Sequence, residues 1–368
     1  MRVLALSIRD FRCYDSAEAD VGEGITVVWG ANGAGKTNLL EALYFGCTGR
    51  SCRTTNEREV VRFGASTTRV VVGLRTSDGT HELAVGFEPG QPKRMSVDGA
   101  PVERLLDVAE RPLISVFMPD RLELVKGAPG VRRAHLDQVV AALWPARTVA
   151  RRAYAHALAQ RNALLARIRS GRASRDTLSA WDIQLAGHGV ELMSDRAEAV
   201  RAAGAPFARY AEDLGLSGAP TVEYRPRSKA TTAEELAEEL AARVDGDLER
   251  GFTGHGPHRD DLLLAREGRE LRSYGSQGQQ RLALLALLLA EREVISDVRP
   301  SPPVMLLDDV MSELDRDRRC ALIDVLRAGA GQAIITTTDL EHVPGADHGD
   351  VSLLAVSDGR LLHEAAEA

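Results

Sequence analysis

Residues near the start of the chain have the types and spacing needed to hold a phosphate group. They fit the pattern G-x-x-x-x-G-K-[ST] in full and are Gly30, Ala31, Asn32, Gly33, Ala34, Gly35, Lys36 and Thr37. Glycines in such a loop let backbone N–H groups turn toward phosphate oxygens, and a following helix adds the positive end of its dipole. We expect Lys36 to reach the β- and γ-phosphates of a nucleotide and the Thr37 hydroxyl to ligate Mg²⁺. A chance glycine turn is the alternative.

Two adjacent carboxylates near the other end of the chain are the expected partners of this loop. Asp308 and Asp309 follow the apolar run 304–307, which indicates a buried strand. Asp308 is expected at the Mg²⁺ of a phosphate site, and Asp309 is placed to orient or deprotonate an attacking water. The alternative is an acidic loop after a strand. Since both pieces must meet at one phosphate, the chain leaves its nucleotide-binding domain and returns to it.

A second turn has the features of an anion site. Ser276, Gln277, Gly278 and Gln279 open a strongly helical segment, 279–293. A serine hydroxyl, free N–H groups and a helix dipole suit an anion. A capped helix after a polar turn would have the same sequence.

Basic residues are concentrated in one segment, although the net charge of −7 excludes a globally positive surface. Residues 138–175 contain no Asp or Glu. Their arginines are Arg147, Arg151, Arg152, Arg161, Arg167, Arg169, Arg172 and Arg175. Such a stripe can neutralise DNA phosphates without sequence preference. A solvated helix face in an arginine-rich composition is an equally good interpretation.

Periodicity predicts the elements that position these residues. A β-branched strand at 25–29 precedes the glycine loop, and a helix follows Lys36. Strands at 69–74, 82–87, 94–97 and 113–117 indicate an antiparallel lobe. Helices follow, including one from Thr232 with a capping box. Strands return at 304–307, 333–336 and 351–356. We therefore expect an α/β ATPase domain in two pieces, 1–118 and 251–368, with an inserted helical domain at 119–250.

The remaining composition points to a cytoplasmic protein. No secretory leader precedes the first strand, and the longest apolar run, Leu282 to Ala290, is too short to span a bilayer. The cysteines lack paired metal spacing and are expected to be reduced thiols; they are Cys13, Cys47, Cys52 and Cys320.

These motifs together resemble those of ABC-type ATPases of the SMC-like branch, and most specifically the RecF family. Residues 276–279 are similar to the ABC signature motif, 312–315 to the D-loop and 8–14 to the start of the SMC-like branch. The resemblance to the RecF family covers nearly the whole chain. Its further matches are Gly30 to Asn38, 124–127, Arg132, Arg133, 160–165, 181–182, 256–261, 277–281 and 306–310. The chain departs from the family at Cys13, where Asn is expected, and at Asp120, where Glu is frequent.

The resemblance implies an ATP-dependent DNA-binding protein of recombinational repair, replication-fork maintenance and the SOS response. Such proteins act on gapped, duplex or single-stranded DNA with RecR and RecO type mediators and help to load recombinase. ABC-type ATPases bind two ATP between two heads, and each signature motif caps the partner's nucleotide. The resemblance therefore implies Mg²⁺ and ATP as cofactors, an ATP-dependent homodimer, and slow ATP hydrolysis used as a switch.

Other interpretations remain open from the residues. A transporter subunit would have a shorter gap between phosphate loop and signature, and a defence nuclease would need an extra domain. A nucleotide-gated DNA clamp or scaffold is the main alternative function. His258 suits either a metal site or an ion-paired corner. Arg12 could reach the nucleotide, and Thr336 could sense its γ-phosphate.

Overall fold

The computed structural model of the chain describes residues 1–108, 111–118, 122–329 and 331–362. The fold divides into two compact units. The first comprises Met1–Arg121, Asp213–Gly215 and Ile295–Ala368, and the second comprises Leu122–Glu212 and Leu216–Val294.

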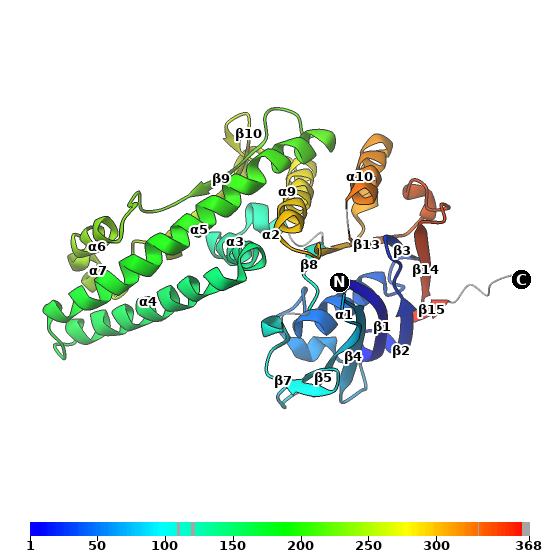
Figure 1. Ribbon diagram of the computed structural model, residues 1–368, viewed down its shortest axis with the longest axis horizontal. Helices are drawn as coiled ribbons and strands as arrows, with labels where there is room; N and C mark the ends of the chain where they lie inside the picture. The colour runs from blue at the N-terminus through cyan, green and yellow to red at the C-terminus, as the bar shows by residue number, and fades with distance from the viewer. Residues whose placement is uncertain (109–110, 119–121, 330, 363–368) are drawn as a thin grey trace, which may run out of the picture. The chain divides into compact units, whose positions relative to one another are not determined.

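The first unit contains a six-stranded antiparallel sheet, drawn mainly in blue in Figure 1. Its strands, in sheet order, are β2 (Tyr14–Asp20), β1 (Arg2–Phe11), β4 (Thr68–Arg75), β5 (Thr80–Phe87), β6 (Arg94–Val97) and β7 (Ala100–Val102). Apolar side chains alternate along the strands, so one face is buried, with Leu6, Ile8, Val70, Val72 and Val85 in the core. The opposite face includes small side chains and the charged Arg9 and Glu82.

A second six-stranded sheet in this unit is mostly parallel. Its order is β15 (Arg360–Leu362), β14 (Val351–Ser357), β3 (Ile25–Trp29), β13 (Ala333–Thr337), β12 (Val304–Leu307) and β8 (Ile114–Phe117). Only β15 pairs antiparallel, with β14. The strands β12 and β13 are fully buried apolar runs with almost no polar residue before their carboxyl ends, as expected for the middle of a parallel sheet.

The helices of the first unit are α1 (Lys36–Thr48), α10 (Arg316–Ala328) and the 3-10 helices η1 (Glu57–Val60), η2 (Leu105–Asp107), η7 (Val310–Glu313) and η8 (Leu340–His342). Of these, α1, η7 and η8 come after strands of the parallel sheet, whereas η1 follows α1 and η2 follows β7. The helix α1 starts directly after β3 and its glycine loop. Because β3, β13 and β12 are adjacent and parallel, the loops that leave their carboxyl ends share one edge of the sheet.

The second unit is mainly helical and contains a small sheet of order β11 (Arg269–Glu270), β10 (Asp261–Arg266) and β9 (Thr221–Arg225). Its helices are α2 (Glu123–Lys126), α3 (Pro129–Leu143), α4 (Thr148–Arg169), α5 (Leu178–Asp213), α6 (Ala233–Ala241), α7 (Val244–Arg250), α8 (Leu271–Tyr274) and α9 (Gln277–Val298). Single-turn 3-10 helices are η4 (Pro145–Arg147), η5 (Arg175–Thr177) and η6 (Pro257–Arg259). The expected capping box of α6 is present, with Thr232 and Glu235 bonded reciprocally.

The compact units differ from the expected domain boundaries. Residues 251–294 were expected in the second ATPase piece but lie in the unit that contains the long helices. The reason is the pairing of β10 with β9, which ties residues 261–266 to 221–225. The expected boundary at residue 119, and Asp120, lie outside the described residues. The helices of the described part of the chain include none that is long and apolar enough to cross a membrane.

Candidate nucleotide-binding site

The phosphate-type loop has the backbone geometry that only glycine allows at two positions. Gly30 follows β3 with φ +155°, and a Cβ atom there would lie 2.1 Å from the Val356 carbonyl oxygen. Gly35 precedes α1 with φ +122°, and a Cβ atom there would lie 2.9 Å from the Tyr14 hydroxyl oxygen. The loop is therefore fixed between the first strands and the end of β14.

The loop leaves the start of α1 open to an anion. No side chain caps the helix, and its first turn contains no acidic residue. Ala31, Asn32 and Gly33 are exposed, so their backbone faces solvent. N–H groups at such an uncapped terminus, together with the helix dipole, attract negative charge. The strand, loop and helix order predicted around Gly30 to Thr37 is present, and phosphate binding by this loop stays a prediction.

Lys36 lies folded against the loop. Its Nζ donates to the carbonyl oxygens of Gly30 at 2.8 Å and Ala31 at 3.0 Å. Burial lowers the pKa of the Lys36 ammonium, and the negative charges of Asp309 and Asp308 oppose that change. The ammonium thus sits within the field of both carboxylates, at the loop whose N–H groups suit phosphate.

The Thr37 hydroxyl and the Asp308 carboxylate meet directly. Thr37 Oγ1 lies 2.9 Å from both Oδ1 and Oδ2 of Asp308. Asp308 is 6% exposed, and this burial raises the pKa of its carboxyl group, while hydrogen bonds from Thr336 and Thr37 oppose the rise. A hydroxyl and a carboxylate held together in this way are hard oxygen ligands of the kind that Mg²⁺ prefers.

Thr336 links the two adjacent carboxylate residues. Its Oγ1 donates to Asp308 Oδ1 at 2.7 Å and accepts from the backbone N–H of Asp309 at 2.8 Å. A serine or threonine hydroxyl can do both at once, so Thr336 fixes the side chain of one residue and the backbone of the next. Thr336 was predicted only as a γ-phosphate sensor, and the sequence offered no signal for this contact.

Asp309 has a constrained backbone and a carboxylate held from one side. Its φ is +45°, in the left-handed region. Ser312 Oγ lies 2.9 Å from both the carbonyl oxygen and the Oδ2 of Asp309. The Oδ1 atom is buried and has no hydrogen-bond partner within the described part of the chain. One oxygen of Asp309 is therefore anchored by Ser312, and the other makes no hydrogen bond to the described residues.

A charged cluster supports α1 behind the loop. Arg12 donates from Nε and a terminal nitrogen to the buried Glu41 carboxylate at 2.9 and 2.7 Å. Arg53 donates to Glu41 at 3.2 Å and to Asn38 Oδ1 at 2.9 Å, and Asn38 donates to Cys13 Sγ at 3.1 Å. Arg12 is thus engaged with Glu41 in this structure. The fully buried Glu41, within an apolar helix, was the sequence signal for this cluster and was missed.

The second predicted anion loop lies in the second compact unit. The backbone N–H of Ser276 donates to Gln279 Oε1 at 2.9 Å, and the Gln279 N–H donates to Ser276 Oγ at 3.3 Å. These two bonds form a capping box at the start of α9. Ser276, Gln277 and Gly278 are exposed. The loop is therefore a preformed, solvent-facing helix start, as both sequence interpretations required.

Comparison with known proteins gives the family. The profile described as "RecF/RecN/SMC N terminal domain" matches residues 2–357. A relative from Anaeromyxobacter sp. (strain Fw109-5), named "DNA replication and repair protein RecF", is 38% identical over 370 residues, covering 98% of this chain and 99% of the relative. The chain belongs to the RecF family.

Solved structures agree with this assignment. The structure titled "recombination mediator protein RecF-ATP in RecFOR pathway" has a TM-score of 0.85 at 26% identity and covers 99% of this chain and 98% of its own. An SMC head bound to the C-winged helix domain of ScpA has a TM-score of 0.61 at 16% identity, covering 100% and 98%, which shows the fold alone. The predicted fold class, an ABC-type ATPase head with a helical insertion, is confirmed.

Within this RecF-family fold, one predicted DNA contact requires correction. Arg161 is fully buried, and its guanidinium donates to Asp182 at 2.6 Å, Asp247 at 2.7 Å and Thr253 at 2.8 Å. A buried arginine with two carboxylate partners cannot reach a DNA phosphate. Arg161 instead joins α4, α5 and α7 in the helical unit.

The other predicted arginines differ in their surroundings. Arg147 is paired with Asp195 and Glu198 and stacks on Trp144, and Arg151 pairs with Asp137 at 3.2 Å. Arg152, Arg167 and Arg169 are exposed. The pairing carboxylates come from α3 and α5, so the segment without acidic residues in sequence is partly neutralised by its neighbours in space.

The His258 ring is held by two hydrogen bonds within the helical unit. Its Nε2 lies 2.8 Å from the Thr253 carbonyl oxygen and its Nδ1 lies 2.7 Å from the Tyr154 hydroxyl. The described residues contain no group of three or more His, Cys, Asp or Glu side chains suited to a metal ion. The ring therefore holds a corner of the helical unit.

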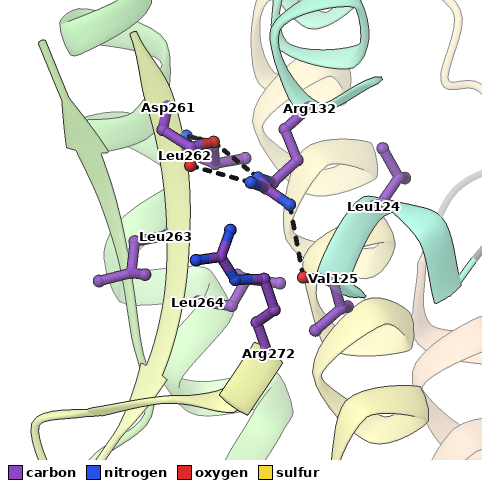
Figure 2. Close-up of a pocket in the computed structure, with 8 residues that line it drawn as sticks. All are labelled: Leu124, Val125, Arg132, Asp261, Leu262, Leu263, Leu264 and Arg272. Atoms are coloured by element: carbon purple, nitrogen blue, oxygen red, sulfur yellow. Dashed lines mark hydrogen bonds and ion pairs between the residues drawn. The ribbon is translucent and has the colours of Figure 1, made fainter. Parts of the chain in front are cut away.

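The family motifs around Arg132 and Asp261 also meet in the helical unit. Arg132 forms a bidentate pair with Asp261 at 2.7 and 2.8 Å and donates to the Gly127 carbonyl at 2.7 Å. Figure 2 shows this pair at the rim of a small pocket lined by leucines of β10, with the Arg272 side chain directed into it. The pairing fixes α3 and the end of α2 to the start of β10.

Proposed function

We propose that this chain binds ATP with Mg²⁺ at the loop from Gly30 to Thr37. The contact between Thr37 and Asp308 carries the proposal, because it joins the two halves of a phosphate site from opposite ends of the sequence. Thr37 and Asp308 would hold the ion, which would supply charge neutralisation at the phosphates. Lys36 and the uncapped N–H groups of α1 would bind the β- and γ-phosphate oxygens.

The same site supports slow hydrolysis used as a switch. Asp309 would accept a proton from the attacking water through Oδ1, while Ser312 and Thr336 hold its side chain and backbone. Aspartate is shorter than glutamate and reaches less far into the site, which suits slow turnover.

A second copy of the chain would complete the site. The exposed loop of Ser276 to Gln279 begins a helix and could bind an anion. In sequence it is far from the phosphate loop, Gly30 to Thr37. In ABC-type ATPases this motif caps the nucleotide of a partner head. We therefore propose an ATP-dependent homodimer, with Ser276, Gln277, Gly278 and Gln279 contacting the partner's nucleotide.

The family membership supports a role in DNA repair and replication. The ATP-closed dimer would bind gapped, duplex or single-stranded DNA in the cytoplasm and cooperate with RecR and RecO type mediators to load recombinase. Arg167 and Arg169, which remain exposed on α4, are the arm residues proposed to contact phosphates. A nucleotide-gated DNA clamp or scaffold is the second candidate function, and an ATPase rate that stays low with DNA would favour it.

The test measures gel-shift binding to gapped, duplex and single-stranded DNA, with and without ATP. We expect ATP to strengthen binding of the wild-type chain and to have no effect on the Lys36→Ala variant. Charge reversal of Arg167 and Arg169 should weaken binding and flatten its dependence on salt. DNA binding that is equally strong with and without ATP would contradict the proposed function.

A further inference from the structure

The outer face of the antiparallel sheet carries a row of arginines. The strand register places Arg9 of β1 opposite Arg69 of β4, and Arg69 opposite Gly86 of β5, which pairs with Arg94 of β6. Cross-strand partners point to the same side of a sheet. Arg9, Arg69 and Arg94 therefore form one row on one face, and all are exposed. We call these three residues the arginine row.

The alternation of the strands separates this row from the core. One residue earlier along β1, Ile8 lies opposite Ala17 and Val70, and Val70 lies opposite Val85. These side chains are buried against the core, so the next residue on each strand must face outward. The register thus fixes the direction of the arginines without relying on any one rotamer.

None of the carboxylates in the described part of the chain forms an ion pair with the arginine row. Among the described residues, no ion pair or side-chain hydrogen bond is formed by Arg9, Arg69 or Arg94. Nearby Asp10 and Asp15 are both paired with Arg62 at 2.7 Å. Glu18 of β2 lies opposite Ser7, two residues along the strand from Ser16, which lies opposite Arg9. Like charges directly opposite each other on adjacent strands are destabilising unless an anion lies between them.

A fully exposed aromatic residue lies in the turn beside Arg9 and Arg69. Phe63 is 99% exposed. Phe63 lies in the turn that leads into β4. Before the turn, the Arg62 N–H donates to the Asp10 carbonyl of β1, and after it, Thr68 Oγ1 donates to the Arg9 carbonyl of β1. Phe63 thus lies at the end of β1 and β4 that carries Arg9 and Arg69. A single exposed ring does not by itself indicate a partner. Beside a row of unpaired arginines, however, it adds a flat face on which a nucleic-acid base can stack.

We infer that the arginine row and Phe63 form a DNA contact on the ATPase head, separate from the arm arginines. The row contacts successive backbone phosphates, and Phe63 stacks on an unpaired base, as occurs at a gap or strand end. Charge complementarity favours DNA over other partners, since the surface offers cations and one flat apolar ring. Gly86 lies between Arg69 and Arg94, and Ser16 lies beside Arg9 on the outer strand, so these small residues leave room for a backbone to lie on the sheet.

The inference rests on the proposed function, so its test must separate the two. The row variant Arg9→Glu/Arg69→Glu/Arg94→Glu is compared with a dispersed variant, Arg201→Glu/Arg227→Glu/Arg360→Glu, which changes the net charge equally at exposed positions outside the antiparallel sheet. Binding to gapped DNA is measured at several salt concentrations in the presence of ATP. We expect the row variant to bind at least about 10-fold more weakly, with a salt slope reduced by about 2 to 3.

The role of Phe63 is tested by substitution within the same assay. Phe63→Ala should weaken binding to gapped and single-stranded DNA by about 5- to 150-fold with little change in salt slope, since stacking is not ionic. Phe63→Trp should retain binding, because it keeps a flat ring. Thermal melting and ATP binding of each variant check the fold, and the glutamine version of the row variant avoids new negative charge.

The outcomes distinguish the two proposals. If the wild-type chain binds no DNA with or without ATP, both the proposed function and the inference are wrong. If the wild-type chain binds DNA and the row and dispersed variants bind equally well, only the inference is wrong. Loss of binding to a mediator protein with unchanged DNA affinity would assign the surface to a protein partner and would also overturn the inference.

Discussion

The Thr37 hydroxyl lies 2.9 Å from each carboxylate oxygen of Asp308, a residue 271 positions further along the chain. Two parallel strands of the same sheet, β3 and β12, deliver these residues, with β13 between them. Because Thr336 at the end of β13 donates to the same carboxylate, three strand ends converge on one buried charge. This convergence is the physical basis for the predicted Mg²⁺ site.

Replacing Asp308 should lower the affinity for Mg-ATP without lowering the melting temperature of the free chain. Since burial raises the pKa of Asp308, the native state holds its proton more tightly than the unfolded state. The contribution of Asp308 to the free energy of unfolding therefore falls as the pH rises from the ordinary Asp range through the raised pKa. Without metal or nucleotide, Asp308→Asn should melt at an equal or higher temperature than the wild type at neutral pH. Its affinity for Mg-ATP should fall at least about 10-fold.

The control for this prediction is Asp324→Asn, on α10 of the same unit. This substitution also removes one negative charge, but at a position that does not contact Thr37 or Thr336, so it should leave Mg-ATP binding unchanged. Calorimetric titration with Mg-ATP and scanning fluorimetry measure both quantities. Unchanged Mg-ATP affinity in Asp308→Asn would remove Asp308 from the site.

ATP should join two chains through the Ser276 loop. In Asp309→Asn, which is expected to bind ATP but hydrolyse it slowly, light scattering should give a dimer mass with ATP and a monomer mass without it. Adding Ser276→Arg should restore the monomer while leaving ATP binding intact, because a bulky cation at the exposed loop blocks the partner but lies outside the phosphate loop. A variant that stays monomeric with saturating ATP would contradict ATP-dependent dimerisation.

Arg161 should contribute to stability. Arg161→Ala leaves the buried carboxylates of Asp182 and Asp247 without their shared cation, and removing one partner of a buried pair costs about 3–5 kcal/mol. The exposed neighbour Arg167→Ala should change the free energy of unfolding by no more than about 0.5 kcal/mol. Urea denaturation measures both. If Arg161→Ala unfolds like the wild type but binds DNA poorly, its assignment as a buried structural residue is wrong.

Local sequence patterns predicted the parts of the site that depend on neighbours in the chain. The strand β3, the glycine loop and α1 follow from residues 25–48 alone, and β12 follows from a short apolar run. The strand β2 was not predicted because its buried positions include Ala17 and Ala19, which have weak β propensity.

Contacts between distant segments could not be predicted in the same way. The burial of Arg161 depends on Asp182 and Asp247, and the pairing of Arg147 depends on α5. The sequence around these arginines contains no acidic residue, so it indicated a free basic stripe. The arginine row shows the converse, because Arg9, Arg69 and Arg94 are spread over three strands and only the register brings them together.

His258 should make the helical unit sensitive to acid. Its Nε2 donates to the Thr253 carbonyl, which leaves Nδ1 to accept from the Tyr154 hydroxyl. Burial lowers the pKa of His258 to about 4, and the positive charges of Arg259 and Arg133 act in the same direction. An unfolded histidine titrates near pH 6.5, so between about pH 6.5 and 4 the unfolded chain binds the extra proton. Stability must then fall as the pH falls through this window, by up to about 3 kcal/mol.

The His258→Gln variant tests this sign. It removes the titrating group, so its free energy of unfolding should be lower than that of the wild type at pH 7.5 but should change less between pH 7 and pH 5. In a Trp29→Phe background, urea titrations followed by tryptophan fluorescence report on the helical unit, because the remaining Trp144 and Trp181 both lie in it. The carboxylates are common to both proteins and cancel in the comparison. Parallel pH profiles would show that His258 does not stay neutral in the folded chain, since only a depressed pKa makes the two profiles converge toward acid.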